Sequence, residues 1–489
     1  MKKLVCLCLA LLTVAALSAC GEPASGNDTT SPASALPEVT ETQPPETIPF
    51  DLVEKRDYGG FVFNILYPDT DHCERDFEAE NVNGEVQNDA VYERNTAVEN
   101  RLNVKLALTV VDTADIVIEH VNKQFASGDN SFDMFGGHRS LLALSYQGKL
   151  YDLRKLEALD FDGAWWDGNY NDTMTINGSL YSAVGDLSVA SMLFVSSLTF
   201  NKRLMDESNI AYPYDKVRNG EWTYQELLET VKDYGSDTDG DGTMKLEKDV
   251  YSIVGWSYES GFSCFYSSGF TFMTRSAEGK YEVDFDSDRL TDLLEKANAL
   301  WHTQYAVCYN ASGDAEHEKL YKVFADGRAL FSDICLSKIG RFYTNMADDY
   351  GILPFPKFTA DQDRYYSYCG YTIPVTLAPR NIEDPERTGT VIEALAKASY
   401  TMVTPKIFEI VTKSRNVRDA DSPEMVEIVY RNKFYDVAHF YNLPQLGSLS
   451  RDLIISNNTG MSAKIKSGRT QGAKEWDKIQ QAYDALSAG

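Results

Sequence analysis

The chain has 489 residues, 43% of them apolar and 12% aromatic, so it can bury a large core and exceeds the length of one typical domain. Its formal net charge of −27 excludes a basic nucleic-acid-binding surface and disfavours contact with anionic membranes. Only six histidines are present, which argues against a histidine-based metal enzyme.

The N-terminal segment has the composition of a targeting signal followed by a tether. Residues 1–19 combine Lys2 and Lys3 with an apolar run, which is typical of a secretory signal peptide. The ending "LSAC" resembles a bacterial lipobox, so we expect cleavage before Cys20 and a lipid on Cys20; an ordinary signal with a chance cysteine is the alternative. Residues 20–50 are rich in Pro, Thr, Ser and Glu and predict a disordered tether. The later cysteines form no C-x-x-C pair, which argues against a zinc site and leaves one or two disulfides open.

Strand and helix patterns alternate from Phe61 onward. The segment "FVFNILYP" at 61–68 predicts a buried strand. Residues 88–111 predict an amphipathic helix that leads into a strand, and residues 114–137 repeat that order. Such alternation is typical of parallel α/β layers.

The second half of the chain predicts further helices and one crossing segment. Strong helical patterns lie at 220–235, 287–304 and 382–403. The first of these has Thr223 as its N-cap, Glu226 closing a capping box and Gly235 near its C-cap. The short segment 350–358 is interrupted by two prolines, so it predicts a crossing between layers rather than a core strand.

Seven stretches, taken in order, resemble one protein family. They are "NDAVYERNTAVE", "FDMFGGHRSLLALSYQGKLYDL", "INGSLYSAVGD", "LTFNKRL", "GEWTYQELLETVKDYG", "FADGRALF" and "YGILPFPKF" followed by "YYSY". Each motif is loose, and their order along the chain carries the specificity. On this basis the chain resembles the family-1, carbohydrate-type extracellular solute-binding proteins of bacterial ABC importers. The lipobox and the Pro/Thr-rich tether fit this resemblance and imply a lipoprotein.

The resemblance implies a two-lobed α/β fold of the periplasmic-binding-protein type (type II), with hinge strands between the lobes. The N-terminal lobe would comprise residues 51–195 and 357–405, and the C-terminal lobe residues 196–356 and 406–489. In this family the solute binds between the lobes, which close around it by a hinge motion.

The implied function is capture of a carbohydrate, expected to be an oligosaccharide, and its delivery to an ABC import permease. The protein would be an extracytoplasmic monomer, anchored to the bacterial cell membrane through the lipid on Cys20, without nucleic-acid partners, catalytic residues or a required cofactor. A solute-sensing receptor module for a membrane sensor is one alternative, and a secreted polysaccharide-degrading enzyme is another. Such an enzyme needs paired carboxylates, but 73 acidic residues make pairs common, and no G-x-S-x-G, H-E-x-x-H or P-loop motif occurs.

Sugar recognition needs flat apolar rings together with convergent polar groups, and several residues near expected strand ends supply them. The candidates are His138, Arg139, Trp165, Trp166, Asp186, Trp256, Tyr258, Glu259, Arg341 and Tyr366. Trp256 is expected to face the Trp165–Trp166 pair across the cleft and complete a stacking sandwich. The alternative for each aromatic residue is ordinary packing in the core.

The stretch "DTDGDGTMKLEKD" begins like a calcium-binding loop. With Asp237 at position 1, Asp239 and Asp241 take positions 3 and 5, and Thr243 supplies its carbonyl at position 7. Position 12 is Lys248, flanked by Glu247 and Asp249, so a terminal acidic ligand is available only if the register slips by one; Asp249 is the expected ligand. The sequence therefore predicts a structural Ca²⁺ that braces a helix against a strand, with a metal-free acidic turn as the alternative.

Overall fold

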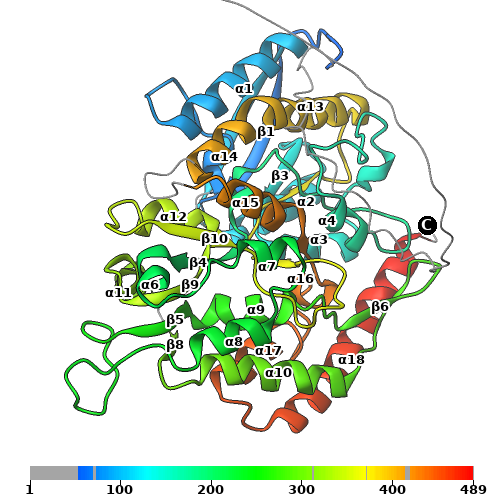
Figure 1. Cartoon of the computed structure of the whole chain (residues 1–489). Coiled ribbons are helices and arrows are strands. Elements are labelled where there is room, and N and C mark those ends of the chain that lie inside the picture. Colours follow the sequence, from blue (N-terminus) through cyan, green and yellow to red (C-terminus); the bar gives the residue numbers. More distant parts are fainter. Residues whose placement is uncertain (1–52, 70–72, 311–312, 371, 413–418, 488–489) are drawn as a thin grey trace, which may run out of the picture. The chain divides into compact units, whose positions relative to one another are not determined.

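The computed structural model describes residues 53–69, 73–310, 313–370, 372–412 and 419–487 (Figure 1). The predicted signal peptide, Cys20 and the tether lie outside these ranges. Within them, no helix combines the length and the apolar composition that a membrane crossing requires.

A four-stranded sheet is built from three strands early in the chain and one late strand. Its members are β1 (Phe61–Pro68), β2 (Val104–Val111), β3 (Met134–Gly137) and β12 (Val375–Leu377), in the order β12-β3-β1-β2. β1 is parallel to both β2 and β3, and β12 pairs antiparallel with β3. The parallel pairs are joined through α1 (Val86–Leu102) and α2 (Ala114–Ser127), as the alternating pattern predicts.

A five-stranded sheet occupies the middle of the chain. It contains β4 (Ser196–Asn201), β5 (Tyr251–Trp256), β8 (Ala306–Tyr309), β9 (Ala329–Cys335) and β10 (Tyr350–Leu353), in the order β10-β4-β9-β5-β8. β5 is parallel to its neighbours β8 and β9, whereas β4 runs antiparallel to β9 and β10. Consequently the carboxyl ends of β5 and β9 and the amino end of β4 meet at one edge of this sheet.

Helices pack against both sheets. α9 (Ser257–Tyr266) and α11 (Asp314–Ala325) each contact β5 and β9, while α13 (Pro385–Ala398) lies beside α1 (Figure 1). α8 (Tyr224–Val231) begins as expected, because the Thr223 hydroxyl accepts a hydrogen bond from the Glu226 amide at 3.4 Å. α10 (Ser287–Trp301) confirms a second predicted helix.

The remaining elements are short, apart from the last helix. The helices are α3 (Ala143–Tyr146), α4 (Gly168–Thr173), α5 (Val189–Leu193), α6 (Lys202–Glu207), α7 (Tyr214–Arg218), α12 (Leu336–Phe342), α14 (Thr404–Thr412), α15 (Ser422–Arg431), α16 (Val437–Phe440), α17 (Leu449–Ile455) and α18 (Met461–Ser487). Single turns of other helix types are η2 (Cys73–Asp76), η3 (Arg139–Leu142), η4 (Leu153–Lys155) and η5 (Ser399–Val403). Two small sheets pair β6 (Met273–Arg275) with β7 (Tyr281–Val283), and β11 (Ser367–Tyr368) with β13 (Lys433–Phe434).

One predicted element differs in the structure. Residues 350–353 form β10, a fully buried strand, and not only a crossing segment. The prolines at 354 and 356 follow the strand, so they remove no hydrogen-bond donor from its ladder. β10 also lies at the sheet edge, where such short strands are common.

The main hydrophobic core includes residues of both sheets. Leu66 and Phe135 belong to the same cluster of buried side chains as Ile253 and Ile334. The described residues form a single compact unit within 48–489, so the boundaries of the two predicted lobes stay a prediction. The cysteines whose side chains the structure describes carry free thiols; they are Cys264, Cys308, Cys335 and Cys369.

Candidate functional site

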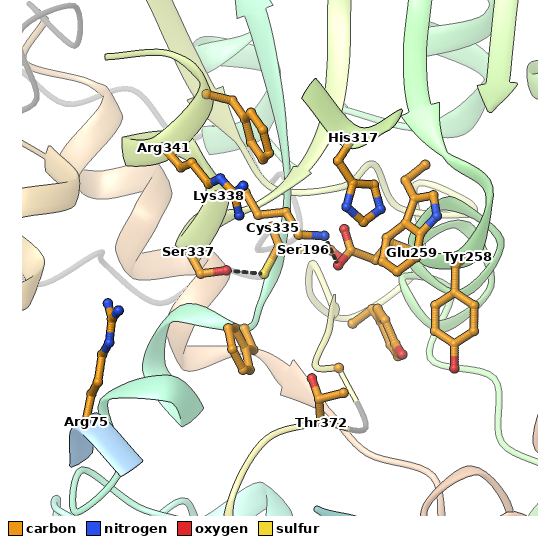
Figure 2. Close-up of a pocket in the computed structure, with 15 residues that line it drawn as sticks. Arg75, Ser196, Tyr258, Glu259, His317, Cys335, Ser337, Lys338, Arg341 and Thr372 are labelled. Carbon is orange, nitrogen blue, oxygen red and sulfur yellow. Dashed lines mark hydrogen bonds and ion pairs between the residues drawn. The ribbon is translucent and has the colours of Figure 1, made fainter. Parts of the chain in front are cut away.

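A cavity of about 810 Å³ lies where strand ends of the five-stranded sheet meet residues that follow the other sheet (Figure 2). Trp256 and Cys335, the last residues of β5 and β9, line it together with Ser196, the first residue of β4. Arg75 comes from η2, which follows β1 of the four-stranded sheet. This size suits a small-molecule solute of more than one ring.

Two strand-to-helix turns deliver most of the polar side chains. α9 begins directly after Trp256, so Tyr258 and Glu259 lie in its first turn. α12 begins directly after Cys335, and Lys338 and Arg341 are one turn apart on it. Residues three apart on a helix share a face, so both long cationic side chains reach the cavity.

The Glu259 carboxylate forms the central ion pair of the wall. Its Oε1 lies 2.6 Å from Nζ of Lys338, and the same ammonium lies 4.4 Å from the centre of the Trp256 ring. Oε2 of Glu259 is buried and has no hydrogen-bond partner among the described residues. A buried carboxylate oxygen without a donor is costly, so this atom favours a solute hydroxyl or a water as its partner.

Aromatic rings complete the wall of the cavity. The Trp256 and Tyr258 rings stack, with centroids 5.0 Å apart and an interplanar angle of 24°. Phe194, Phe342 and Tyr368 also line the cavity. These rings offer the flat apolar surface that the C–H face of a sugar needs.

The Cys335 thiol lies in the wall but is poorly suited to nucleophilic chemistry. It contacts the carbonyl oxygen of Leu193 at 3.1 Å, and Ser337 donates a hydrogen bond to its sulfur at 3.3 Å. Burial, reinforced by the negative charge of Glu259, raises the pKa of this thiol to about 12. At neutral pH the sulfur therefore stays protonated, whereas a nucleophilic cysteine acts as the thiolate.

His138 and Arg139 lie elsewhere, so the structure does not bring them to the large cavity. They line a smaller cavity of about 150 Å³ beside α16. The Arg139 guanidinium is buried and donates to the carbonyl oxygen of His439 and, at 3.4 Å, to Asn442. Burial, together with the charge of Arg139, lowers the pKa of His138 to about 4. Arg139 therefore holds the C-terminal segment in place.

Trp165 and Trp166 do not form the sandwich with Trp256 that the sequence suggests. Each is only 6% exposed and belongs to the core around the four-stranded sheet. The Trp166 indole donates to Glu393 of α13 at 3.0 Å, and the Lys397 ammonium lies 4.6 Å from the Trp165 ring centre. The two rings are packed under α13 because that helix supplies both an apolar surface and an acceptor for the indole.

Asp186 and Tyr366 also lie outside the cavity wall. Asp186 is 2% exposed and accepts hydrogen bonds from the hydroxyls of Tyr430 at 2.6 Å and Thr404 at 2.7 Å. Burial raises the pKa of Asp186 to about 6. Tyr366 donates to Asp363 at 3.0 Å and packs edge-on against a neighbouring aromatic ring.

Several residues of the wall were not expected from the sequence. They are Arg75, Phe194, Ser196, His317, Ser337, Lys338, Tyr368 and Thr372. Lys338 could have been found, because it precedes the candidate Arg341 by three residues just after a strand. Arg75 had no such signal, since it follows β1 in a polar stretch and reaches the cavity only through the packing of η2. Asp76 of η2 accepts backbone hydrogen bonds from Val189 at 2.8 Å and Ala190 at 3.3 Å, which fixes this turn.

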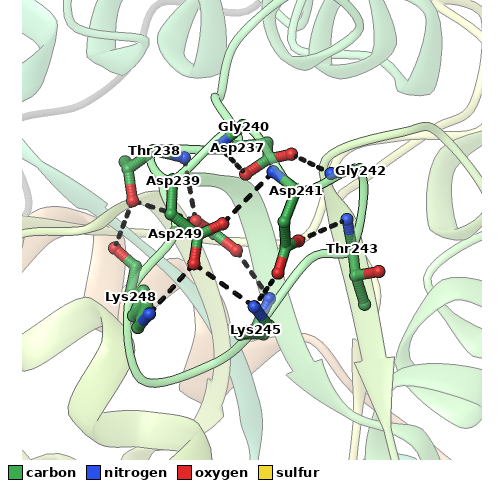
Figure 3. A network of polar contacts seen from close by, with 10 residues as sticks. All are labelled: Asp237, Thr238, Asp239, Gly240, Asp241, Gly242, Thr243, Lys245, Lys248 and Asp249. Atoms are coloured by element: carbon green, nitrogen blue, oxygen red, sulfur yellow. Dashed lines mark hydrogen bonds and ion pairs between the residues drawn. The ribbon is translucent and has the colours of Figure 1, made fainter.

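The acidic loop at 237–249 folds into a compact turn (Figure 3) and contributes no residue to the cavity wall. Carboxylate oxygens of Asp237, Asp239 and Asp249 lie within 4.8 Å of one another. Asp249 is buried and accepts from the amides of Thr238 at 2.9 Å and Lys245 at 2.7 Å. Asp249, and not position 12 of the calcium-loop pattern, therefore lies beside Asp237, as expected if the loop register is shifted by one residue.

Lysine side chains also reach this loop. Lys248 contacts Asp239 at 2.9 Å, and Lys245 contacts both Asp239 and Asp241. Asp241 is not one of the three clustered carboxylates, and its Oδ1 accepts from the Thr243 amide at 2.9 Å. The donor set of three carboxylates suits a hard cation such as Ca²⁺ once the two ammonium groups move aside.

Solved structures share this fold at low sequence identity, although the sequence matches no protein-family model and no curated protein. The sugar-binding protein MalE from Xanthomonas citri superimposes with a TM-score of 0.59 over 86% of this chain and 99% of its own, at 11% identity. A sugar transporter protein from Rhizobium etli in an open conformation gives a TM-score of 0.55 over 86% and 100%, at 15% identity. A de novo designed cysteine esterase superimposes with a TM-score of 0.55 over 87% of this chain and 99% of its own, at 14% sequence identity. The chain therefore has the two-lobed α/β fold of periplasmic sugar-binding proteins, which confirms the predicted fold class.

Proposed function

We propose that the chain is the extracytoplasmic solute-binding component of an ABC importer and that it holds a carbohydrate in the 810 Å³ cavity. The observation that carries this proposal is the position of the cavity, beyond the carboxyl ends of β5 and β9, with η2 of the other sheet contributing Arg75. Open α/β folds bind their ligands at such strand ends. The fold likeness to sugar-binding proteins supports the same function, and the lipid on Cys20 and delivery to a membrane permease are part of the proposal.

The chemistry of the wall suits a carbohydrate. Five aromatic rings line the cavity, and hydroxyl groups of Ser196, Ser337 and Thr372 lie among them. Oε2 of Glu259, for which the described part of the chain offers no hydrogen-bond donor, adds an acceptor for a sugar hydroxyl. Polar groups placed among aromatic rings are the usual composition of a specific small-molecule site.

A panel of carbohydrates tests this function by thermal unfolding and tryptophan fluorescence. A cognate sugar at a hundred times its Kd should stabilise the protein by about 2.7 kcal/mol. Trp256→Ala should weaken binding at least tenfold, about 1.4 kcal/mol, because it removes both a ring of the wall and the surface under Lys338. Tyr366→Ala is the control, since this tyrosine does not line the cavity.

Two results would contradict the proposal. If neither the carbohydrate panel nor a peptide panel changes the unfolding temperature or the fluorescence, the cavity does not bind such solutes. Sustained hydrolysis of a panel member would instead favour an enzyme, and the designed esterase that shares the fold makes that control worth including.

We also propose that the loop at 237–249 holds one Ca²⁺ as a structural brace between α8 and β5. Addition of EDTA should then lower the unfolding temperature, and Ca²⁺ at a hundred times its Kd should restore about 2.7 kcal/mol. Asp239→Asn should remove this calcium response, because Asp239 is one of the three clustered carboxylates. Asp233→Asn, an exposed acid just before the loop, should leave it intact. Identical unfolding curves with EDTA and with millimolar Ca²⁺ would show that the loop holds no structural Ca²⁺.

A further inference from the structure

A buried acid, Asp333, lies in the middle strand of the five-stranded sheet, close to the cavity wall. It belongs to β9, pairs with Gly255 of β5 and is only 1% exposed. Cys335, two residues further along β9 and on the same face of the strand, lines the cavity. Within the described part of the chain no lysine or arginine forms an ion pair with Asp333, and Lys338, the cation that acts on it, is bound to Glu259 at 2.6 Å. A buried carboxyl group without a counter-ion is favoured in its neutral form.

Two serine hydroxyls of α9 lie beside the Asp333 carboxyl group. They belong to Ser260 and Ser263, whose side chains are fully buried. Gly255 makes room for Ser260, because a Cβ at that position would overlap the Ser260 Oγ. The described residues give neither the two Asp333 oxygens nor the Ser260 Oγ a hydrogen bond of good geometry. Buried polar atoms are rarely left without partners, so small rotations that join these groups are favoured.

The Ser263 hydroxyl connects the acid to the cavity. It donates a hydrogen bond to the Oγ of Ser196 at 2.8 Å, and Ser196, the first residue of β4, lines the cavity (Figure 2). The Ser263 Oγ also lies 3.0 Å from the carbonyl oxygen of Glu259, so its single proton is engaged by acceptors. Ser263 can therefore accept a hydrogen bond from Asp333 but cannot also donate one to it. We call the row Asp333, Ser263 and Ser196 the serine relay.

The number of protons in the serine relay favours the neutral acid. A protonated carboxyl group donates one hydrogen bond and keeps its second oxygen as an acceptor. If Asp333 donates to Ser263 and accepts from Ser260, every one of these groups has a partner. An ionised Asp333 would need donors from both serines, and Ser263 would have to give up its bond to Ser196. Burial acts in the same direction, because it raises the pKa of Asp333 well above its ordinary value of 3.8.

We propose that Asp333 is a neutral acid that sets the direction of the serine relay, so that the Ser196 hydroxyl donates its proton to an acceptor oxygen of the solute. Asp333 is thereby a positioning residue, which acts on the solute through two serines. This inference rests on the proposed carbohydrate-binding function and defines the polarity of one contact, since the sugar must present an acceptor to the start of β4. Loss of the Asp333 proton reverses the relay, because Ser196 must then donate to Ser263, and so weakens binding.

The groups packed around Asp333 keep their charge near neutral pH. Those that act on it are Tyr224, Glu259, Cys264, Cys308, Tyr321, Lys338 and Tyr343. Burial raises the pKa values of the tyrosines and cysteines among them, so these groups stay neutral. Glu259 and Lys338 form the ion pair of the wall. His317 also lines the cavity and is titratable, so its effect must be separated from that of Asp333 by a variant.

Infrared difference spectroscopy tests the protonation state of Asp333 without any ligand. The spectrum of the wild type minus that of Asp333→Asn, recorded at pH 6, should contain the carbonyl band of a protonated carboxylic acid. The band should shift when the protein is transferred to D₂O, because the carboxyl proton is exchanged. A carboxylate band in its place would overturn the proposal.

Isothermal titration calorimetry at pH 6, with the tightest-binding sugar of the carbohydrate panel, tests the serine relay. Ser263→Ala separates the acid from Ser196 and should weaken binding about two- to tenfold, which is the effect of one hydrogen bond. Asp333→Asn should keep the wild-type affinity, since its amide can donate to Ser263 as the acid does. Wild-type affinity in Ser263→Ala, or a loss in Asp333→Asn as large as in Ser263→Ala, would contradict the relay. Thermal unfolding of each variant checks that it is folded at the temperature of the titration.

The pH dependence of binding is the result that a purely structural role of Asp333 would not produce. As pH rises from 6 to 9, the affinity of the wild type should fall with the same midpoint as the infrared band of the protonated acid. Asp333→Asn should lack this step, and any step that persists in it arises from another group such as His317. Ser337→Ala removes a hydroxyl of the same wall outside the relay and should keep the step. Loss of the band without a change in affinity would contradict the coupling.

The failures of the inference and of the proposed function are distinguishable. If sugars bind but Ser263→Ala has no effect, or Asp333→Asn keeps the whole pH dependence, the serine relay is wrong and carbohydrate binding stands. If no sugar of the panel binds, the proposed function fails and the contact with Ser196 fails with it, whereas the infrared spectrum still decides the state of Asp333.

Discussion

Replacing Lys433 with methionine is expected to destabilise the protein by about 3–5 kcal/mol. The Lys433 ammonium lies 2.7 Å from the Asp167 carboxylate, and the two side chains are only 5% and 6% exposed. Asp167 also accepts from the Tyr435 hydroxyl at 2.8 Å and from the Tyr170 amide at 3.1 Å. Removing the lysine leaves a buried carboxylate without its counter-ion, which is far more costly than losing a surface ion pair.

Urea unfolding with two further variants separates this effect from a general loss of charge. Lys478→Met removes a lysine that is 60% exposed and should change the free energy of unfolding by less than about 0.5 kcal/mol. The double variant Asp167→Asn, Lys433→Met should recover part of the loss, since no unpaired charge remains. A loss for Lys433→Met as small as that for Lys478→Met would show that the buried pair contributes little.

The Lys433–Asp167 ion pair also holds a strand next to the proposed binding cavity. Lys433 lies in β13, which pairs with β11, and Tyr368 at the end of β11 lines the cavity. Lys433→Met is therefore also expected to weaken solute binding, through displacement of Tyr368. Binding measured below the unfolding temperature distinguishes this local effect from global unfolding.

Asp186→Asn should change how the stability of the protein depends on pH. Burial raises the pKa of Asp186 from its ordinary value of 3.8 to about 6, with Lys433 acting to lower it and Asp167 to raise it. Between these two pH values the folded state holds the proton more tightly than the unfolded state, so the free energy of unfolding falls as pH rises. The stabilising contribution is full below about pH 4 and is lost by about pH 6 to 7, a change of about 3 kcal/mol.

Asparagine stays neutral over this range and can keep both contacts, because Tyr430 and Thr404 offer hydroxyl groups that donate or accept. The stability of Asp186→Asn relative to the wild type should therefore increase by about 3 kcal/mol between pH 4 and pH 7. Urea unfolding at one-unit pH intervals measures this difference. Asp215→Asn removes a carboxylate that is 89% exposed. This variant tests whether the loss of any negative charge is sufficient to change the pH dependence of stability. A difference that is constant across pH would contradict the prediction.

Hydrophobic period and capping residues were sufficient to predict much of the secondary structure. α1 with β2, and α2 with β3, follow patterns that repeat within about two dozen residues each. The Thr223 cap of α8 likewise depends only on neighbours in the chain. These features are local, so they can be inferred without any knowledge of what packs against them.

The candidate site residues also differ in whether a local sequence pattern is sufficient to place them. Trp256, Tyr258 and Glu259 lie on one turn between β5 and α9, so a single sequence pattern places them together at a strand end. Trp165 and Trp166 looked equally suitable, but α13, more than two hundred residues later in the chain, buries them. An aromatic pair has the same local signature whether it faces a solute or a helix.

The α/β class, the helices with their caps, and the strand-end turn of Trp256 are encoded in short stretches of this chain, because propensity, period and capping act between near neighbours. Arg75, the buried strand β10 and the Lys433–Asp167 pair depend on packing between segments that are far apart in sequence. The cavity belongs to this second group, since it exists only where the ends of β4, β5 and β9 meet η2.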